Sequence, residues 1–416
     1  MKTSGQQTVS VALLTGGSDR PYVFGLVTEL VSKGIALDLI GSDELDFPEF
    51  RRAPGVKFFN LRSSQRPNAG FLRKAFAICA YYARLMRYAA TSKPRLFHVL
   101  WNNKFELFDR TLLILYYKIL GKKVALTAHN VNLARRDSKE DTFLNRVTLG
   151  IQYRLADHTF VHTQDMQREL TEGFGVQKSK VSVIPFGINN QVPNTSLSPS
   201  EAKARLGIRA AEKTVLFFGK IRPYKGLEYL AHAFLQLAKT NEDYRMIVAG
   251  RPGRGCEGYW DAIQEQVHCY EQEGRVLIKA DFIPDDEVEV YFKAADVLVL
   301  PYRNIYQSGV LFLGYSFGLP TLAANVGALQ DDIVEGETGS VFKPEDPTAL
   351  AEAIERYFAS DLYKDLSRRR EGIRSFATQR HSWDVVGQIT TSVYASLLRM
   401  PWQNSLNREP SITSSE

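Results

Sequence analysis

The feature that most constrains this chain is a repeated alternation between short apolar runs and segments with helical periodicity. In the first half, the apolar runs lie at residues 8–14, 35–41, 96–101, 123–129, 158–162 and 181–185. Helical patterns fall between them, for example at 22–33, 71–92, 105–120 and 143–155. Short apolar runs separated by helices are typical of βαβ units with a parallel sheet. The first half is therefore predicted to be an α/β domain.

The alternation stops once and then resumes. Residues 186–203 are rich in Asn, Pro and Ser, which predicts a linker. Beyond it, apolar runs lie at 214–219, 244–250, 275–280, 296–301, 319–324 and 339–342. Helices are expected at about 225–239, 257–271, 284–295, 308–317, 346–359, 361–375 and 382–399. We expect two doubly wound, Rossmann-like α/β domains that face each other across a cleft at the carboxyl ends of their strands.

Length and composition are compatible with this organisation. The 416 residues are 44% hydrophobic and 24% charged, which excludes a low-complexity or disordered chain. The predicted segments are domains over 1–190 and 191–375, a carboxyl-terminal helix over 376–402 that packs back toward the first domain, and a disordered tail over 403–416. Three cysteines are too few for a disulfide scaffold, and no signal peptide or membrane span is evident, so a cytoplasmic protein is expected.

The net charge of +6 is unevenly distributed. Between Glu49 and Glu106 there are twelve Lys and Arg residues and no acidic residue, so the rest of the chain sums to −6. If residues 71–92 form a helix, Arg73, Arg84 and Arg87 fall on one face of it. Together with Lys74 they are the expected membrane-side or acceptor-side residues. A solvated helix face would explain a few such charges. Twelve without an acid favour an anionic partner, either a lipid surface or a lipid-phosphate acceptor. Nucleic acid is not expected, because no recognition motif accompanies the charge.

Glycine-rich turns or helix starts follow several predicted strands. They include Gly16 and Gly17 in the first domain and, in the second, Gly219, Gly250 and the helix start at Gln307, Ser308, Gly309 and Val310. Glycine permits close approach of the backbone to a ligand, and helix N-termini attract anions. Arg222 and Lys225 lie shortly after Gly219, at the opening of the next predicted helix, and would suit a diphosphate. Alone, each feature is also explained by a tight turn or by solvated charges. Their recurrence along one sheet edge favours a ligand cleft.

The second half resembles a known family. The motifs GKIRPYKG, ADVLVLPY, FGLPTLAANVGAL and DIVEGETGSVFKPED occur in this order within residues 214–358. They resemble the donor-nucleotide domain of glycosyltransferase family four, retaining enzymes with the GT-B fold. The first half resembles the family more loosely, through LTAHNVN, FVHTQ and VIPFG. The resemblance implies an acceptor-side domain over 1–190 and a nucleotide-sugar domain over 191–375.

The resemblance also implies roles for individual residues. Arg222 and Lys225 would bind the donor diphosphate, and His129 would face the donor sugar, so these three are the expected catalytic residues. The donor site would further include Gly16, Gly17, Gly219, Gly250, Gln307, Ser308, Gly309 and Val310. No metal and no permanently bound cofactor are expected, since the sequence has no Asp-x-Asp motif of the kind that metal-dependent transferases carry.

The sequence departs from the family in one respect. The family usually carries two glutamates eight positions apart around the 308–317 helix, and Ile305 and Leu313 occupy those positions here. Phe186 likewise replaces a histidine that is common in the family. The departure implies that the contacts to the diphosphate are retained, whereas the contacts to the sugar and the ribose are altered. Gln307 or Ser308 is expected to supply replacement hydrogen bonds.

The expected function is transfer of a sugar, with retention, from a nucleotide-diphosphate donor to a lipid-linked or polysaccharide acceptor. The basic segment would place this hexosyltransferase-like enzyme at the inner face of the plasma membrane. Two alternatives remain open. One is a nucleotide-sugar epimerase of the GT-B fold, and the other is a nucleotide-sugar-binding protein without catalytic activity, which the missing glutamates would fit.

Overall fold

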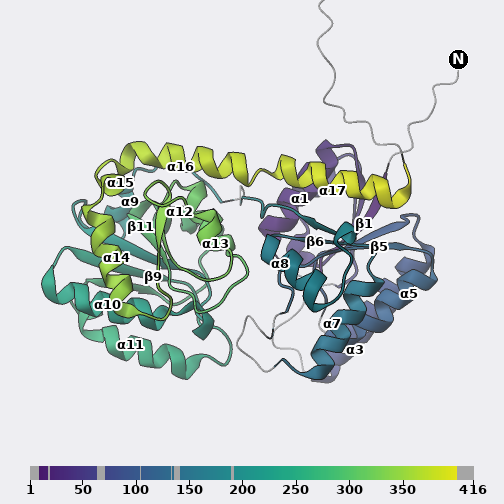
Figure 1. The fold of residues 1–416 in the computed structure, drawn as a ribbon, viewed down its shortest axis with the longest axis horizontal. Helices are drawn as coiled ribbons and strands as arrows, with labels where there is room; N and C mark the ends of the chain where they lie inside the picture. Colours follow the sequence, from purple (N-terminus) through teal and green to yellow (C-terminus); the bar gives the residue numbers. More distant parts are fainter. Residues whose placement is uncertain are drawn as a thin grey trace, which may run out of the picture.

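The computed structural model describes residues 9–16, 19–62, 71–103, 105–132, 134, 141–188 and 192–400. Gly17 and the predicted tail over 403–416 lie outside these residues, as does the side chain of Lys74. Figure 1 shows two α/β domains beside each other, each built on one parallel sheet with helices on both faces. The predicted fold class is confirmed.

The first sheet has seven parallel strands in the order β3-β2-β1-β4-β5-β6-β7. Their bounds are β1 (Ser10–Leu14), β2 (Ala36–Gly41), β3 (Val56–Asn60), β4 (Leu96–Val99), β5 (Lys123–Thr127), β6 (His158–Val161) and β7 (Val181–Val183). The sequence pattern missed β3, which lies in the basic segment. β3 is an edge strand with no fully buried residue, so it lacks the continuous apolar run of its neighbours.

Helices cover both faces of the first sheet, and right-handed crossovers decide which helix lies on which face. One core contains α1 (Arg20–Ser32), η1 (Asp43–Leu45), α2 (Pro48–Arg52) and part of α17. The opposite core contains α3 (Phe71–Thr91), η2 (Asp109–Leu113), α5 (Ile114–Ile119), α7 (Phe143–Leu155), α8 (Gln164–Arg168) and η3 (Glu169–Gly173). Where one helix was predicted over 105–120, α4 (Glu106–Phe108), the π-helical turn η2 and α5 follow one another directly.

The second sheet has six parallel strands in the order β10-β9-β8-β11-β12-β13. Their bounds are β8 (Lys213–Phe218), β9 (Tyr244–Ala249), β10 (Val276–Lys279), β11 (Val297–Leu300), β12 (Thr321–Ala324) and β13 (Gly339–Phe342). Its helices are η5 (Pro223–Lys225), α10 (Leu227–Thr240), α11 (Glu257–Gln272), α12 (Asp285–Ala294), α13 (Gly309–Ser316), η6 (Gln330–Asp332), α14 (Pro347–Ala359) and α15 (Asp361–Lys364). Each predicted strand of this half is present.

The segment predicted as a linker contains a helix. α9 (Pro199–Arg205) begins at Ser198, whose side chain accepts from the backbone N–H of Glu201 while the Glu201 side chain accepts from Ser198 N–H. This capping box, with Pro199 in the first turn, starts a helix in a segment whose Asn, Pro and Ser content suggested only a loop. The helix also packs against α12 of the second domain. The predicted linker over 186–203 was therefore too long.

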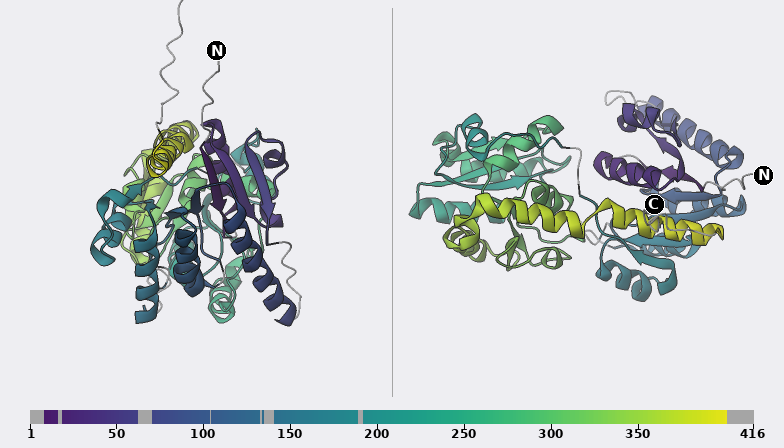
Figure 2. Two further views of the ribbon diagram at one scale, coloured as in Figure 1. Left: turned by 90° about the vertical axis from the view of Figure 1, so that its right-hand side faces the viewer. Right: turned by 90° about the horizontal axis from the view of Figure 1, so that it is seen from above.

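Two helices at the carboxyl end connect the domains. α16 (Leu366–Arg380) packs against α13 of the second domain, and α17 (Trp383–Leu398) packs against α1 and β4 of the first. Figure 2 shows the pair, in yellow, running along both domains. The expected boundary between 375 and 376 falls inside α16, and the bend between the helices lies at residues 381–382.

Candidate functional site

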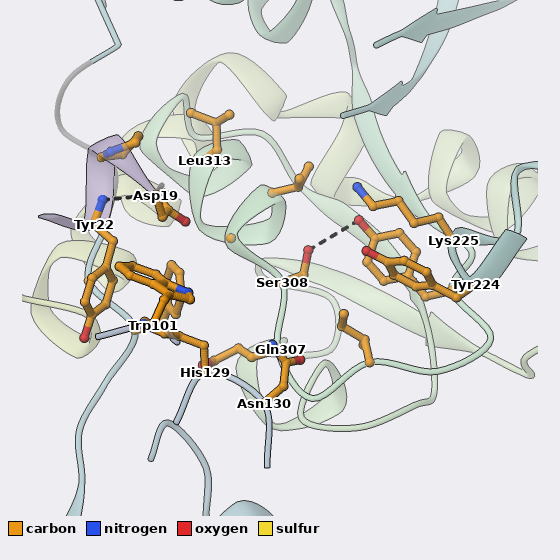
Figure 3. Close-up of a pocket in the computed structure, with 17 residues that line it drawn as sticks. Asp19, Tyr22, Trp101, His129, Asn130, Tyr224, Lys225, Gln307, Ser308 and Leu313 are labelled. Carbon is orange, nitrogen blue, oxygen red and sulfur yellow. Dashed lines mark hydrogen bonds between the residues drawn. The ribbon is translucent and has the colours of Figure 1, made fainter. Parts of the chain in front are cut away.

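A cavity of about 440 Å³ lies between the two domains (Figure 3). The first domain contributes Asp19, Pro21, Tyr22, Trp101, His129 and Asn130 to its lining. The segment after β7, in which the chain passes from the first domain to the second, is called the crossing segment and contributes Phe186 and Gly187. The second domain contributes Tyr224, Lys225, Tyr302, Ile305, Gln307, Ser308, Gly309, Val310 and Leu313.

The position of the cavity follows from the sheet topology. In each sheet the strand order reverses at one point, between β1 and β4 in the first domain and between β8 and β11 in the second. Tyr22 and Trp101 come from the segments after β1 and β4, while Lys225 and Tyr302 come from those after β8 and β11. Loops diverge at such reversals and leave a crevice at the carboxyl ends of the strands. The cavity thus occupies both crevices at once.

Lys225 forms a buried cationic part of the wall. Its Nζ atom lies 5.4 Å from the centre of the Tyr302 ring, within cation–π range. A Cβ atom on Gly219 would lie 3.0 Å from this Nζ, and Gly219 has a φ of +101°. Glycine at 219 therefore allows the ammonium group to sit directly against the strand end. A buried ammonium that lines a cavity favours an anionic ligand there.

The N-terminus of α13 forms the neighbouring part of the wall. Gly309 and Val310, the first helical residues, line the cavity. Ser308 precedes them but makes no side-chain cap, and its hydroxyl instead lies 3.4 Å from the Tyr302 hydroxyl. Among the described residues, no side chain therefore caps the first-turn N–H groups of α13. Together with the helix dipole they add to the positive potential of Lys225.

His129 offers a hydrogen-bond acceptor on the opposite wall. The Ile184 carbonyl can only accept, so Nδ1 of His162, 3.3 Å away, carries the proton. Burial lowers the pKa of His162 to about 4, so it is neutral at pH 7 and its Nε2 accepts from Nδ1 of His129 at 2.9 Å. Burial, with His162 acting in the same direction, also lowers the pKa of His129 well below its ordinary value. Its Nε2 is therefore an unprotonated acceptor, and no described residue donates to it.

Aromatic rings hold His129 in place. Trp101 stacks on its imidazole with ring centres 4.2 Å apart and planes 5° from parallel, and Tyr22 meets it edge-on at 4.6 Å. Figure 3 shows these rings on one side of the cavity and Lys225 with Tyr224 on the other. A stacked imidazole loses little conformational entropy on binding a ligand, so the acceptor atom is pre-oriented.

Gln307 supplies a second acceptor of the same kind. Its Nε2 donates to Oδ2 of Asp332 at 3.3 Å, while its buried Oε1 has no partner within the described part of the chain. Burial raises the pKa of Asp332 to about 6, and the Oδ1 of Asp332 lies 3.7 Å from Nε2 of His381 at the bend between α16 and α17. A buried acceptor without a donor costs free energy, which a hydroxyl-bearing ligand would recover.

The two positions at which the family resemblance led us to expect glutamates also face the cavity. Ile305 and Leu313 both line it and are each 8% exposed. These two side chains cannot accept hydrogen bonds from hydroxyl groups.

A smaller cavity, of about 120 Å³, adjoins the first on the side of the first domain and shares Trp101, His129 and Asn130 with it. Polar side chains from α4, η2 and α7 line its far end, namely Glu106, Arg110 and Gln152. Among the described residues, no group of three or more His, Cys, Asp or Glu side chains could hold a metal ion, and no helix is long and apolar enough to cross a membrane.

Comparison with known proteins identifies the family. The sequence pattern described as Glycosyltransferase Family 4 matches residues 16–192, and that described as Glycosyl transferases group 1 matches residues 212–360. Together the two matches cover well over half of the chain. The chain belongs to glycosyltransferase family four. It is therefore an enzyme, a glycosyltransferase.

Curated relatives agree with this assignment. D-inositol 3-phosphate glycosyltransferase from Acidothermus cellulolyticus is 25% identical over 91% of this chain and 85% of its own length. The same enzyme from Corynebacterium urealyticum is 26% identical over 61% of this chain, and the match spans only 60% of that relative.

Solved structures show that the fold is GT-B. Sucrose-phosphate synthase from Thermosynechococcus elongatus has a TM-score of 0.72 at 20% identity, over 94% of this chain and all of its own. Anabaena HepE, solved in complex with UDP and glucose, has a TM-score of 0.71 at 17% identity, over 94% of this chain and all of its own.

Six of the residues expected to bind the donor or to act in catalysis line the main cavity of this family-four enzyme, namely His129, Lys225, Gln307, Ser308, Gly309 and Val310. The expected donor-site glycines Gly16, Gly219 and Gly250 are not among the residues that line this cavity. A Cβ on Gly16 would lie 2.0 Å from the Trp101 carbonyl oxygen, and one on Gly250 would lie 2.2 Å from that of Gly219. Both glycines therefore bring strand ends together and do not line the cavity.

Arg222 takes a different position from Lys225. Its side chain packs against Gly253 after β9, and it is not among the residues that line the cavity. It lies within a cationic group at the ends of β8 and β9. Partial burial and the charges of Arg222, Arg251 and Arg254 lower the pKa of Lys220, the residue after Gly219.

The sequence did not point to the aromatic residues of the site, among them Tyr22, Trp101 and Tyr302. Nothing in their local pattern separates them from core aromatics. Asp19 was also missed, although Asp before Arg-Pro is a recognisable helix start. Its Oδ1 accepts from Tyr22 N–H at 3.2 Å, and burial raises the pKa of its carboxyl, which lines the cavity.

Proposed function

We propose that this glycosyltransferase transfers a sugar, with retention, from a nucleotide-diphosphate donor to a lipid-linked or polysaccharide acceptor. One observation carries the proposal. The cavity joins an anion-binding wall, formed by Lys225 and the start of α13, to two buried acceptor atoms that lack donors, His129 Nε2 and Gln307 Oε1. A molecule with a diphosphate at one end and sugar hydroxyls at the other satisfies both walls. The second domain would hold the donor, and the first would hold the acceptor.

The residues that line the cavity can supply most of what sugar transfer requires. As the bond between the sugar carbon and the diphosphate oxygen breaks, negative charge grows on the departing diphosphate. Lys225 and the N–H groups of Gly309 and Val310 are positioned to stabilise that charge, and such pre-arranged donors are a large source of catalysis. The acceptor hydroxyl attacks on the face that the diphosphate leaves, and its proton passes to the departing phosphate oxygen. No protein nucleophile and no metal takes part in this scheme.

The apolar side chains of the wall limit which residues can recognise the donor. Because Ile305 and Leu313 cannot bind hydroxyls, recognition of the sugar and the ribose would fall to Gln307, Ser308 and His129. The smaller cavity supports an acceptor approach from the first domain, since Glu106, Arg110 and Gln152 offer hydrogen bonds to a hydroxylated molecule.

Incubation of the purified protein with UDP-, GDP- and ADP-sugars tests the proposal. Slow nucleotide release, accelerated by a suitable acceptor and giving a product of retained anomeric configuration, is the expected result. Conversion of one nucleotide sugar into another without nucleotide release would favour the epimerase alternative. Binding without turnover would favour the non-catalytic alternative.

We further propose that the basic segment over 50–105 places the enzyme peripherally at the cytoplasmic face of the membrane, where lipid-linked acceptors are found. The support is local. Arg73, Arg84 and Arg87 are exposed along one face of α3, as the helical wheel predicts, and no acidic residue lies in that segment.

A further inference from the structure

Large apolar side chains are exposed on one side of the first domain. In the described part of the chain, ten large hydrophobic side chains are exposed, and nine of them lie between residues 76 and 147. Single exposed apolar side chains are common on soluble proteins, whereas a group confined to one region marks an interaction surface. Six of the nine define what we call the apolar ridge, namely Leu112, Leu115, Ile119, Phe143, Leu144 and Val147.

The six side chains come from two adjacent helical segments. Leu112, Leu115 and Ile119 are spaced three and four residues apart along η2 and α5, so they follow one outward face. Phe143, Leu144 and Val147 begin α7, and Arg110 of η2 donates to the Asn145 side chain of α7 at 2.9 Å. Figure 1 shows α5 and α7 close together at the outer side of this domain. Ile119 is 75% exposed and Phe143 84% exposed.

Cations flank the ridge. α3 and α5 are in contact: the Tyr116 hydroxyl of α5 donates to the Met86 carbonyl of α3 at 3.2 Å. The outward face of α3 carries Arg73, Arg84 and Arg87 together with Phe76, which is 77% exposed. An apolar centre beside basic side chains is complementary to an anionic bilayer, in which acyl chains lie beneath phosphate groups. This charge pattern distinguishes a lipid surface from a neutral protein partner.

We propose that the apolar ridge inserts into the interface of an anionic lipid bilayer while the basic face of α3 contacts its phosphates. The segments that carry the ridge also wall the smaller cavity, through Arg110 of η2 and Leu149 of α7. Docking would therefore hold that cavity at the membrane surface, where a lipid-linked acceptor could enter it. The docking rests on the membrane placement proposed above and adds the apolar ridge to it, whereas this last consequence also rests on the proposed sugar transfer.

Vesicle flotation tests the docking. The full chain is mixed with vesicles of phosphatidylglycerol and phosphatidylcholine, or of phosphatidylcholine alone. The wild type is expected to float with the anionic vesicles. A triple variant, Leu112→Ser with Leu115→Ser and Ile119→Ser, should lose at least about tenfold in partition coefficient, because burying even one such side chain changes it by about that factor. Phe282→Ser is the matched control, since Phe282 is the exposed apolar residue of the second domain and should leave flotation unchanged.

Two further variants separate insertion from charge attraction. Leu115→Trp should show blue-shifted fluorescence on anionic vesicles and quenching by brominated acyl chains, which mere adsorption would not give. Charge reversal at Arg73, Arg84 and Arg87 to Glu should abolish flotation with anionic vesicles. Unchanged thermal unfolding midpoints would show that the variants fold.

Other outcomes would contradict the docking proposal or would contradict the proposed function while leaving the docking in place. Absence of wild-type flotation, or equal flotation of the triple variant, contradicts the proposal. If the wild type does not float but forms a concentration-dependent dimer that the triple variant lacks, the ridge is a contact between two copies of the chain. Flotation without any donor turnover would leave the docking in place and contradict the proposed function instead.

Discussion

At the scale of single residues, Lys225 and Arg222 show how similar sequence positions acquire different environments. The sequence places both cations beside a strand end and a helix start. In the structure only Lys225 lines the cavity, where it is buried against Tyr302, whereas Arg222 packs against Gly253. The difference arises from η5, a single turn that carries Lys225 under the strand end and ends at Gly226 with a φ of +65°.

Replacement of these two cations should therefore have unequal effects. Lys225→Ala is expected to lower kcat by roughly 10²-fold or more, because it removes a buried charge beside the departing diphosphate. Arg222→Ala should lower kcat by less than about tenfold, since its guanidinium acts from outside the cavity wall through weaker, solvent-screened attraction. Steady-state kinetics with a nucleotide sugar checks this. Equal losses in the two variants would mean that Arg222 contacts the donor as the sequence alone suggested.

Asp332 should make stability depend on pH. Burial raises its pKa from 3.8 to about 6, so its contribution to stability is complete below pH 4 and is lost as pH rises through 6. The free energy of unfolding of the wild type minus that of Asp332→Asn should thus fall by up to about 3 kcal/mol between pH 4 and pH 7. Urea denaturation at several pH values measures it. A flat difference for Asp332→Asn would contradict the burial effect.

At the scale of elements, the ends of adjacent strands build the hydrogen-bond relay to His129. His129 follows β5, His162 follows β6 and Ile184 follows β7, and these strands are neighbours in the sheet. Parallel pairing brings the three ends to one edge, so residues far apart in sequence become a chain of donors and acceptors. Strand positions were predictable from the apolar runs, but the relay depends on which strands are adjacent.

The relay predicts that His162 positions His129. His162→Leu should lower kcat/KM for the donor by about tenfold, because the His129 Nδ1–H loses its acceptor and the orientation of the ring is no longer fixed. His162→Gln should recover part of this loss, since its side-chain oxygen can accept from the same N–H. Kinetics and thermal unfolding of both variants check this. Equal activity of the Leu and Gln variants at equal stability would leave His162 with a packing role alone.

At the scale of the whole molecule, Trp383 connects the domains at the point where the chain crosses twice between them. Its indole N–H donates to the Ile188 carbonyl at 2.8 Å, and its ring lies against Gly25 of α1 and Gly187 of the crossing segment. A Cβ on either glycine would lie within 2.3 Å of a ring carbon. The cavity between the domains thus depends on a contact between α1 and α17, at opposite ends of the chain.

A double-mutant cycle should reveal this contact. Gly25→Ala is expected to destabilise the protein by about 1–3 kcal/mol through overpacking, although alanine normally favours a helix. In a Trp383→Ala background the same change should cost little or become stabilising, because the clash is gone. Gly372→Ala in α16 is the matched control, since a Cβ there meets nothing within 4 Å. Chemical denaturation measures the four proteins of the cycle and the control, and an additive cycle would contradict the contact.

The sequence by itself determined the fold class, most strand positions and the family, because apolar periodicity and glycine turns are local properties of the chain. It also indicated Lys225, His129 and the start of α13, whose motifs are contiguous. Tertiary structure alone decided which of these residues share a cavity, which glycines only bring backbones together, and that Tyr22, Trp101 and Asp332 belong beside them. These features depend on strand order and on the approach of two domains. No local pattern encodes such contacts, since each joins residues that the chain keeps far apart.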